Sequence, residues 1–269
     1  MSPAPPLITL LTDFGTRDYF VASLKGVILT INPAARIVDL SHDIAPFGIL
    51  EAAYCLSSSY RYFPDGTIHV AVVDPGVGSA RRPILVKTSR YYFVAPDNGI
   101  LTPVLNESRD IEIYQLENLE YQLATLGATF HGRDVFAPAA AWVSRGAVLS
   151  LFGRPVFDPV KADWPQPTVN EGSVVGQIMY ADRFGNLITN LTLRDIAGGL
   201  ASSARSTPVI RIAGYTIDKL VRCYGDGDGG APQALINSGG YLEIFLKEGN
   251  AASRMYWGPG QLVEVQLGR

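Results

Sequence analysis

A carboxylate and a guanidinium stand at the two ends of a short loop in the segment VVDPGVGSAR. Asp74 follows the apolar run 67–73, and Arg81 comes after a proline and two glycines. Asp-Pro and glycine are frequent in turns, so a simple turn between two strands explains the pattern. The alternative interpretation is an active-site loop at the carboxyl end of a strand, where open α/β sheets bind their ligands.

Other polar side chains also follow apolar runs in the first half of the chain. Together with Asp74 they are Asp13, Asp39, His42, Asp43 and Asp97. Any one acid is ordinary, because aspartate favours turns. If the runs are parallel strands, however, these side chains share one edge of the sheet and favour a ligand cleft there. Such a cleft could grip the two hydroxyls of a ribose, or it could hold Mg²⁺ as phosphatases do.

One of the three histidines has the context of a functional residue. His69 lies inside an apolar run and is expected in the core, and His42 lies in a turn, as a cap or a site residue. His131, in FHGRD, directly precedes a predicted helix. A helix N-terminus disfavours a protonated imidazole, so His131 could act as a neutral base or hydrogen-bond acceptor. A simple capping histidine explains the same pattern.

Two motifs of the second half carry side chains suited to a small molecule. In DRFGNLITN, Phe184 and Asn186 lie between two strand-like runs. A hairpin turn is the simplest explanation, but an aromatic surface beside an amide also matches the edge of an adenine. In NSGGYLEI, which GNAA follows, Ser238 and Glu243 could bind a zwitterion such as an amino-acid head group.

Strands and helices that would position these side chains alternate along the first part of the chain. Asp18 is a plausible N-cap of the first helix, and Asn32-Pro33 ends it. Strands are expected at 6–15, 35–43, 67–76 and 111–116, a hairpin at 83–99, and helices at 18–33, 49–63, 99–105 and 132–146. This alternation predicts an α/β fold with a mostly parallel sheet that helices cover on both faces.

The composition changes near Phe152. Residues 154–172 are rich in proline and lack periodicity, so they are expected to form a surface linker. Short alternating runs follow, namely VVGQIMYAD, NLITNLT, PVIRIAG, YLEIFLK and LVEVQLG. They predict a small antiparallel β-barrel or sandwich. The expected organisation is an α/β domain at 1–153, a linker at 154–172 and a β-barrel domain at 173–269.

Charge and cysteine content argue against several classes of function and location. The 269 residues include 22 Lys and Arg against 25 Asp and Glu, a net charge of −3, so the chain shows no electrostatic footprint for nucleic acid or an anionic membrane. Its two cysteines are far apart, which argues against a disulfide framework and for a reducing, cytoplasmic location. We expect neither a signal peptide nor a membrane-spanning stretch.

Six motifs, taken in order, resemble those of one protein family. They are TDFG, VVDPGVGSAR, APDNGIL, FHGRDVFAP, DRFGN and NSGGYLEI with the following GNAA. In this combination the chain resembles the S-adenosyl-L-methionine (SAM) hydroxide adenosyltransferases, relatives of the SAM-dependent chlorinase and fluorinase. The resemblance extends from about Ile8 to the C-terminus. Several long motifs in one order are far more specific than any single short pattern.

The resemblance implies a fold, an assembly and a reaction. The fold is a Rossmann-like α/β domain followed by a smaller antiparallel β-barrel. The assembly is a homotrimer in which each substrate lies between the N-terminal domain of one subunit and the C-terminal domain of its neighbour. The reaction is attack of water or hydroxide on ribose C5′ of SAM, which gives adenosine and L-methionine. SAM is then the substrate, and no cofactor or metal is implied.

The resemblance also implies roles for individual residues. The catalytic residues would be Asp74, Arg81 and His131, which would orient one water and accept its proton, because a sulfonium is already a good leaving group. The sequence leaves open whether Asp74 or His131 accepts this proton. The implied binding residues are Asp13 at the ribose hydroxyls, Phe47 over the ribose, Phe184 and Asn186 at the adenine, Asp182, Ser238 and Glu243 at the methionine portion, and the Ala251 backbone at the purine.

The chain departs from the fluorinase pattern at the site of the nucleophile. The fluorinase has a tyrosine where this chain has Asp74, and tyrosine-serine where it has His131-Gly132. It also has an arginine where this chain has Gly239, and an insertion that the segment 87–99 lacks. An anionic Asp74 would repel a halide ion, which favours water as the nucleophile.

Three other interpretations stay open at this point. A halogenase would differ only in its nucleophile, so a comparison of halide with water separates it from a hydrolase. A metal-dependent phosphatase would use the acids of the sheet edge, but it leaves FGN and NSGG without a role. A non-catalytic adenosine-binding or sensor protein would bind the same molecule without reaction.

Overall fold

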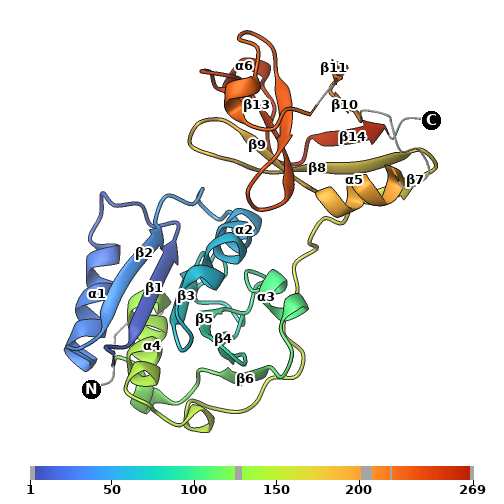
Figure 1. Ribbon diagram of the computed structural model, residues 1–269. Helices are drawn as coiled ribbons and strands as arrows, with labels where there is room; N and C mark the ends of the chain where they lie inside the picture. Colours follow the sequence, from blue (N-terminus) through green and yellow to red (C-terminus); the bar gives the residue numbers. More distant parts are fainter. Residues whose placement is uncertain (1–3, 125–128, 201–207, 219, 267–269) are drawn as a thin grey trace. The chain divides into compact units, whose positions relative to one another are not determined.

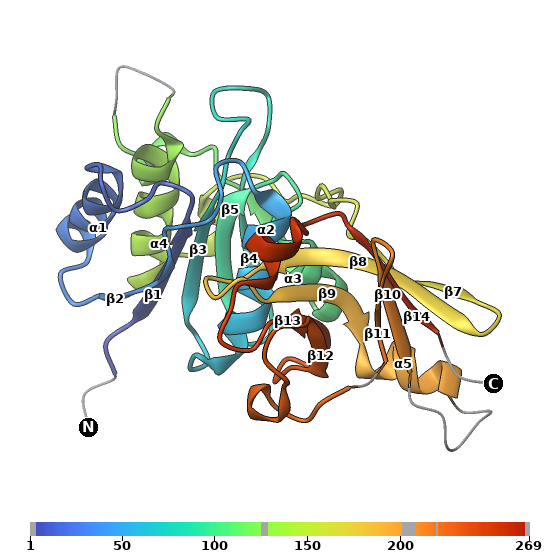
Figure 2. The same ribbon diagram turned by 90° about the horizontal axis from the view of Figure 1, so that it is seen from above.

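The structure is a computed structural model that describes residues 4–124, 129–200, 208–218 and 220–266. The chain divides into two compact units, Met1–Trp164 and Pro165–Arg269, which we call the first unit and the second unit (Figures 1 and 2). Among the described residues, no helix has the length and apolar character that a membrane span requires.

A six-stranded sheet forms the centre of the first unit. Its order is β2-β1-β3-β5-β4-β6, and its strands are β1 Leu7–Thr12, β2 Arg36–Ser41, β3 Ile68–Val72, β4 Pro83–Lys87, β5 Tyr92–Pro96 and β6 Glu112–Gln115. Strands β1, β2, β3 and β5 are parallel, whereas β4 pairs antiparallel with β5 and β6. Because β1 and β3 are buried on both faces, they are largely apolar, and their polar residues Thr9, Thr12 and His69 are buried as well. The predicted α/β sheet is confirmed, with the hairpin β4–β5 as its antiparallel part.

Helices cover both faces of this sheet (Figure 2). They are α1 Phe20–Ile31, α2 Ile49–Ser59, α3 Thr102–Glu107 and α4 Ala137–Ser144, and single 3₁₀ turns lie at Tyr60–Tyr62, Leu119–Tyr121 and Leu149–Leu151. On one face, Leu24 of α1 and Ala140 of α4 belong to the same core cluster as Leu10. On the other face, Leu56 of α2 and Val104 of α3 belong to a second cluster. The two-sided cover predicted from the sequence is confirmed.

The ends of α1 agree with the sequence prediction only in part. We predict Asp18 as the N-cap, but the structure places Tyr19 there, without a side-chain hydrogen bond. The prediction was wrong because the Ser23 N–H donates to the carbonyl oxygen of Tyr19 (2.9 Å), which puts the cap one residue after Asp18. The other end is as predicted, because Asn32 is the C-cap and donates its N–H to the carbonyl oxygen of Ile28.

An antiparallel sheet forms the second unit. Its order is β11-β10-β14-β8-β9-β13-β12, and β7 also pairs with β8. The strands are β7 Thr168–Asn170, β8 Ser173–Ala181, β9 Leu187–Thr192, β10 Val209–Ile212, β11 Tyr215–Ile217, β12 Gln233–Ile236, β13 Tyr241–Phe245 and β14 Leu262–Gln266, and the helices are α5 Leu193–Leu200 and α6 Ala251–Met255, with a 3₁₀ turn at Tyr224–Asp226. A bridge between Leu220 and Ala234 brings the chain after β11 to β12, so the sheet nearly closes around an apolar core. The predicted β-barrel is confirmed, and Leu267 and Gly268 of its last predicted strand lie outside the described residues.

The proline-rich segment predicted as a linker contributes to both units. The Val156 N–H donates to the carbonyl oxygen of Ile113 (2.9 Å), and the Ala162 N–H donates to Thr102 Oγ1 (2.8 Å). These bonds hold the first part of the segment against the first unit. The later part contains β7, which pairs with β8 in the second unit.

Candidate active site

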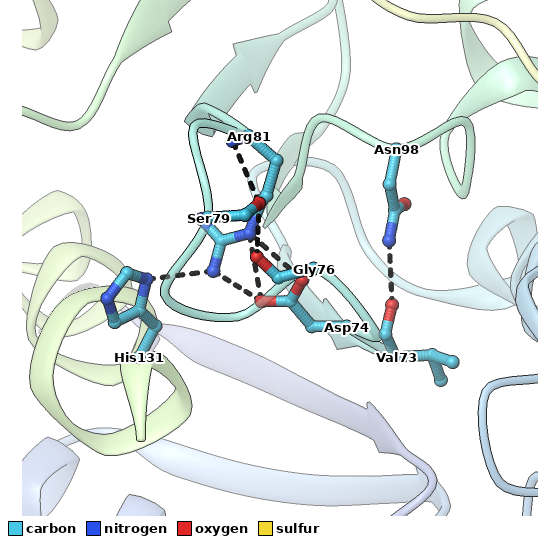
Figure 3. Close-up of polar contacts among 7 residues, drawn as sticks. All are labelled: Val73, Asp74, Gly76, Ser79, Arg81, Asn98 and His131. Carbon is cyan, nitrogen blue, oxygen red and sulfur yellow. Dashed lines mark hydrogen bonds and ion pairs between the residues drawn. The ribbon is translucent and has the colours of Figure 1, made fainter. Parts of the chain in front are cut away.

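Asp74 and Arg81 form a buried ion pair just beyond the carboxyl end of β3 (Figure 3). Arg81 Nε lies 2.9 Å from both Oδ1 and Oδ2 of Asp74, and Nη2 also pairs with Oδ2. The two side chains are only 6% and 9% exposed. Between them, the N–H and the hydroxyl of Ser79 both donate to the Gly76 carbonyl oxygen, which folds the loop back. The strand end therefore holds an acid and a cation together, as the active-site interpretation of this loop requires.

His131 joins this pair through its Nδ1 atom, which lies 2.8 Å from Arg81 Nη2 (Figure 3). A guanidinium only donates hydrogen bonds, so Nδ1 is the acceptor and the neutral ring carries its proton on Nε2. Burial, followed by the charge of Arg81, lowers the pKa of His131 from its usual value of 6.5. The residue precedes a π-helical turn, Gly132–Phe136, a form frequent at functional sites. The predicted neutral histidine thus owes its state first to burial.

Asp74 and His131 line a cleft of about 280 Å³. Its other walls include Phe14, Phe20 and Phe130, whose ring centroids lie 5.2 to 5.8 Å apart. An apolar cleft with a few polar groups is typical of a small-molecule site. Sequence reasoning missed the three phenylalanines, although two of them stand beside predicted site residues in TDFG and FHGRD.

Asp13 and Phe47 line the same cleft. The Phe47 N–H donates to Asp13 Oδ2 at 3.0 Å. Phe47 has a φ of 66°, a left-handed conformation that is unfavourable for a residue with a side chain, and it is 69% exposed. Strain of this kind is frequent at binding sites, where the surrounding structure maintains it. The carboxylate of Asp13 is the group that holds Phe47 at the cleft.

Two other acids of the sheet edge have separate partners. Asp39 pairs with Lys25 at 2.6 Å, and Asp97 pairs with Arg82 at 2.6 Å. Within the described parts of the chain, no group of three or more His, Cys, Asp or Glu side chains is placed to hold a metal ion. The carboxylates therefore do not converge as a magnesium site requires.

The other two histidines do not line this cleft. His69 is fully buried, stacks on the ring of Phe93 with centroids 5.1 Å apart, and lies 2.7 Å from Thr9 Oγ1 through Nδ1. Burial lowers the pKa of His69 to about 3. His42 is also buried, and its Nδ1 lies 2.8 Å from Thr12 Oγ1. The prediction that His69 is a core residue is confirmed.

The second unit has a cavity of its own, of about 720 Å³, which Asp182, Phe184 and Asn186 line. Asp182 shapes their loop, because its Oδ1 accepts the N–H groups of Phe184 (2.9 Å) and Asn186 (2.8 Å). Its Oδ2 accepts from Asn186 Nδ2 at 3.0 Å. Phe184 is 74% exposed, whereas Asn186 is buried. The loop thus presents an aromatic ring at the cavity with an amide beside it.

The segment around Ala251 packs against this loop. The Ala252 N–H donates to the carbonyl oxygen of Gly185 at 3.0 Å. The side chain of Asn250 fills the space beside Gly185, where a Cβ atom would lie 2.1 Å from it. Asn250 also caps α6, because its Oδ1 accepts the N–H of Ser253 at 2.7 Å. Two motifs that are far apart in the sequence, DRFGN and GNAA, therefore meet at one cavity.

Glu243 lies behind the wall of this cavity. It is 3% exposed, and it accepts hydrogen bonds from the Tyr224 hydroxyl (2.6 Å) and from Asn237 Nδ2 (3.1 Å). Tyr224 lines the cavity, and burial together with the bond to Glu243 raises the pKa of its hydroxyl. Ser238 lies in the exposed turn after Asn237. Sequence reasoning missed Tyr224, which stands outside every motif that it used.

The predicted site residues therefore fall into two groups. The first unit holds Asp13, Phe47, Asp74, Arg81 and His131, and the second unit holds Asp182, Phe184, Asn186, Ser238, Glu243 and Ala251. The first group can orient and activate a water molecule. The second group can bind a flat ring with hydrogen-bonding edges.

Comparison with known proteins finds relatives along nearly the whole chain. Family models match for the SAM hydroxide adenosyltransferase N-terminal domain at residues 8–153 and for the C-terminal domain at residues 176–264. An (R)-S-adenosyl-L-methionine hydrolase of Thermus thermophilus is 36% identical over 91% of this chain and 93% of its own. A crystal structure of an uncharacterized conserved protein from Thermotoga maritima is 34% identical and has a TM-score of 0.88, over 96% of this chain and 99% of its own. Fluorinases are more distant, and that of Actinoplanes sp. is 31% identical over 89% of this chain and 90% of its own.

Proposed function

This chain belongs to the SAM hydroxide adenosyltransferase family, and on that premise we propose that it hydrolyses S-adenosyl-L-methionine to adenosine and L-methionine. The observation that carries the proposal is the buried cluster of Asp74, Arg81 and His131 at the edge of an aromatic cleft. In a sulfonium substrate the positively charged sulfur is already a good leaving group. The protein therefore needs a fixed, activated water and no general acid.

In the proposed step, the oxygen of a water attacks ribose C5′ while the bond from C5′ to sulfur breaks on the opposite side. The bonding electron pair passes to sulfur, which becomes the neutral thioether of methionine. The water oxygen, now bound to C5′, loses one proton and becomes the 5′-hydroxyl of adenosine. Holding the water in line with the breaking bond lowers the barrier through proximity and orientation.

Asp74 is the proton acceptor in this proposal. His131 Nδ1 already accepts from Arg81, and a proton added there would place an imidazolium beside a guanidinium. A carboxylate has more lone pairs than the bonds to Arg81 occupy. The oxonium that forms when neutral water attacks carbon is also a far stronger acid than a carboxylic acid, so a carboxylate is a sufficient base. His131 instead donates from Nε2 and helps to orient the water.

Asp13 and Phe47 hold the ribose in the proposed complex. One carboxylate oxygen of Asp13 accepts the Phe47 N–H, which leaves the other for the ribose hydroxyls. The exposed ring of Phe47 would then lie over the sugar. This arrangement makes the strained backbone of Phe47 part of the binding surface.

The second unit binds the two ends of the substrate in this proposal. Phe184 and Asn186 take the adenine, with the Ala251 backbone at the purine edge. Asp182 and Ser238 take the methionine portion. Glu243 supports the cavity wall and does not contact the substrate. Its carboxylate already accepts hydrogen bonds from the Tyr224 hydroxyl and from Asn237, in the turn that carries Ser238.

Water is the nucleophile in this proposal, and halide is not. Asp74 offsets the charge of Arg81, so the guanidinium gives little attraction to an anion. A carboxylate accepts a hydrogen bond from water and repels a halide ion. The halogenase interpretation is therefore the less favoured one, although fluorinases are relatives of this chain.

We further propose a cytoplasmic homotrimer in which each site combines the first unit of one subunit with the second unit of its neighbour. The support is that each unit carries only part of the residues that the substrate needs. Co-expressed Asp74→Ala and Asn186→Ala subunits should recover activity, because mixed trimers contain sites with neither defect. Each variant alone is the control. A fully active monomer in sedimentation experiments would contradict this assembly.

The proposed function is tested by incubating the purified protein with SAM, with and without EDTA, and separating the products. Adenosine and methionine should appear in equal amounts, and the chelator should have no effect, since the proposed step uses no metal or cofactor. Methylthioadenosine as the product would contradict the proposal, because it requires cleavage of a different carbon–sulfur bond. A loss in EDTA that added Mg²⁺ restores would contradict the metal independence.

A further inference from the structure

The motif APDNGIL contains two polar side chains, Asp97 and Asn98, to which the proposed reaction assigns no role. They lie directly after β5, in the loop that leads to α3. Asn98 Nδ2 donates to the carbonyl oxygen of Val73 at 2.8 Å (Figure 3). Its Oδ1 accepts the N–H of Ile100 at 3.2 Å, which fixes the orientation of the amide. Asn98 therefore holds the backbone immediately before Asp74.

The bond to Val73 takes the place of a strand contact. Among the described residues, the pairs that join β3 and β5 end at Val70 and Val94, so the ladder stops before Val73. Val73 is fully buried, and a buried carbonyl without a partner is unfavourable. This carbonyl belongs to the planar peptide unit that ends at the Asp74 Cα atom. Holding it therefore fixes the direction in which Asp74 leaves the strand.

Asp97 holds the other end of the same loop. Its N–H donates to the carbonyl oxygen of Arg82 at 2.8 Å, and its Oδ2 accepts from Arg82 Nε at 2.8 Å. Its Oδ1 accepts the N–H of Val160 at 2.7 Å, and the residue is 5% exposed. Arg82 directly follows Arg81. Asp97 and Asn98 together therefore contact the sequence neighbours of both charged members of the ion pair.

We propose that Asp97 and Asn98 are positioning residues that set the spacing of Asp74 and Arg81. The loop between the pair contains Gly78 at a φ of 78°, and glycine restricts the backbone least, so the ends of the loop need an external support. The inference rests on the proposed function, because its consequence is the rate of that reaction. A misplacement of about 1 Å can lower a rate about 100-fold, so the two residues should act on turnover more than on affinity.

Asn118 provides a matched control in the same unit. Its Nδ2 donates to the carbonyl oxygen of Leu151 at 2.8 Å, and its Oδ1 accepts the N–H of Glu120 at 3.0 Å. These are the same two kinds of bond that Asn98 makes, but the carbonyl that Asn118 holds belongs to Leu151, which is not a sequence neighbour of Asp74 or Arg81. Asn118→Ala should therefore remove equivalent bonds without moving the catalytic pair.

The test compares the full-length wild type with Asn98→Ala, Asp97→Asn and Asn118→Ala, each assayed with SAM below its thermal midpoint. For Asn98→Ala, kcat should fall about 10- to 100-fold while KM stays within about twofold. Asp97→Asn keeps the side-chain volume and should change kcat in the same direction, which preserves the test if Asn98→Ala does not fold. Asn118→Ala should keep the kcat of the wild type.

The titration of His131, followed by NMR on histidine-labelled protein, is the second readout. The charge of Arg81 lowers the pKa of His131, and the charge of Asp74 raises it. Displacement of Asp74 in Asn98→Ala should therefore lower that pKa, displacement of Arg81 in Asp97→Asn should raise it, and Asn118→Ala should leave it unchanged. Wild-type kcat and an unchanged His131 titration in Asn98→Ala would overturn the inference and leave the proposed function intact. A wild type that forms no adenosine would refute the proposed function, and the inference with it.

Discussion

Three functional side chains of the first unit are bonded to one another, whereas the Asp182 side chain of the second unit is bonded within its own turn. Arg81 joins Asp74 and His131, which come from different elements. Asp182 makes three bonds within its own turn and leaves Phe184 exposed at the cavity. Opposite charges that act on one water need a fixed spacing in a buried place, whereas a flat ligand needs shape and a few hydrogen bonds. The difference is the one expected if, as we propose, the first unit carries the catalytic cluster and the second unit binds the two ends of the substrate.

The largest effect should come from removing a charge in the first unit. Asp74→Asn keeps the size of the side chain but cannot take up the proton, so kcat should fall about 10²- to 10⁴-fold. KM should change little, because no residue of the second unit is altered. Steady-state kinetics with SAM measure both. An unchanged kcat would contradict the proposal that the first unit performs the chemistry while the second unit binds the substrate.

His131→Asn sharpens the same comparison inside the catalytic cluster. An asparagine can accept from Arg81, as His131 does in the structure, and it can donate to water, as we propose for His131. This variant should therefore keep a higher kcat than Asp74→Asn. Equal losses in the two variants would contradict the assignment of Asp74 as the proton acceptor and His131 as a group that only orients the water.

A second-unit variant should act on KM. Phe184→Ala removes an aromatic surface for the adenine, and base stacking on an aromatic ring contributes about 1–3 kcal/mol, so KM should rise about 5- to 140-fold. The value of kcat at saturating SAM should stay within about threefold of the wild type. Tyr256→Ala is the control, because Tyr256 is an exposed aromatic residue of the same unit that does not line the cavity. A fall in kcat at constant KM would place Phe184 in the chemistry.

Acid should destabilise the first unit before the second, because all three histidines lie in the first. The pKa of His69 is about 3 in the folded state and 6.5 in its usual state, so the folded protein binds this proton more weakly than the unfolded chain. The stability that neutral His69 contributes to the folded state is complete above pH 6.5 and is lost as the pH falls toward 3. At pH 5 the loss in the free energy of unfolding should be about 2 kcal/mol.

Hydrogen exchange followed by mass spectrometry can measure this loss separately in each unit. Protection of β1 and β3 should fall between pH 7 and pH 5 more than protection of β8 and β9. His69→Phe should reduce this pH dependence, whatever its effect on absolute stability. An equal decline in the two units, or the same pH dependence in His69→Phe, would contradict the role assigned to His69.

The smallest effect should come from a charge in the first unit that lies away from the cleft. Lys87 on β4 pairs with Glu112 on β6 at 2.6 Å, and the two side chains are 39% and 47% exposed. Lys87→Ala should lower the free energy of unfolding by less than about 1 kcal/mol. Both kinetic constants should stay at wild-type values. A tenfold loss of kcat would show that charge acts on the reaction over a long distance.

Much of the first unit could be predicted from the sequence, because its strands are buried on both faces. Strands β1 and β3 are largely apolar, and Asp13 and Asp74 stand where these runs end, so the sheet edge could be located in advance. The resemblance also grouped Arg81 with Asp74 as catalytic residues, and the structure shows the two side chains as an ion pair. The short strands β11 and β12, of three and four residues, were not predicted.

Contacts between distant segments could not be predicted from local pattern. Asn98 meets Val73, and Tyr224 meets Glu243, through approaches that only the folded sheet and barrel create. The cap at Tyr19 was missed for a related reason, since packing rather than a polar side chain sets the start of α1. Sequence patterns thus identified the groups that bear the chemistry better than the groups that hold them in place.

Turnover in water enriched in oxygen-18 tests the central claim most directly. The purified enzyme is incubated with SAM in the labelled water, with and without a high concentration of chloride, and the nucleoside products are examined by mass spectrometry. Attack of water on C5′ predicts one labelled oxygen per adenosine, in the fragment that contains the ribose, and no 5′-chloroadenosine. Unlabelled adenosine, or a chlorinated product from the wild type, would contradict the proposed roles of Asp74, Arg81 and His131.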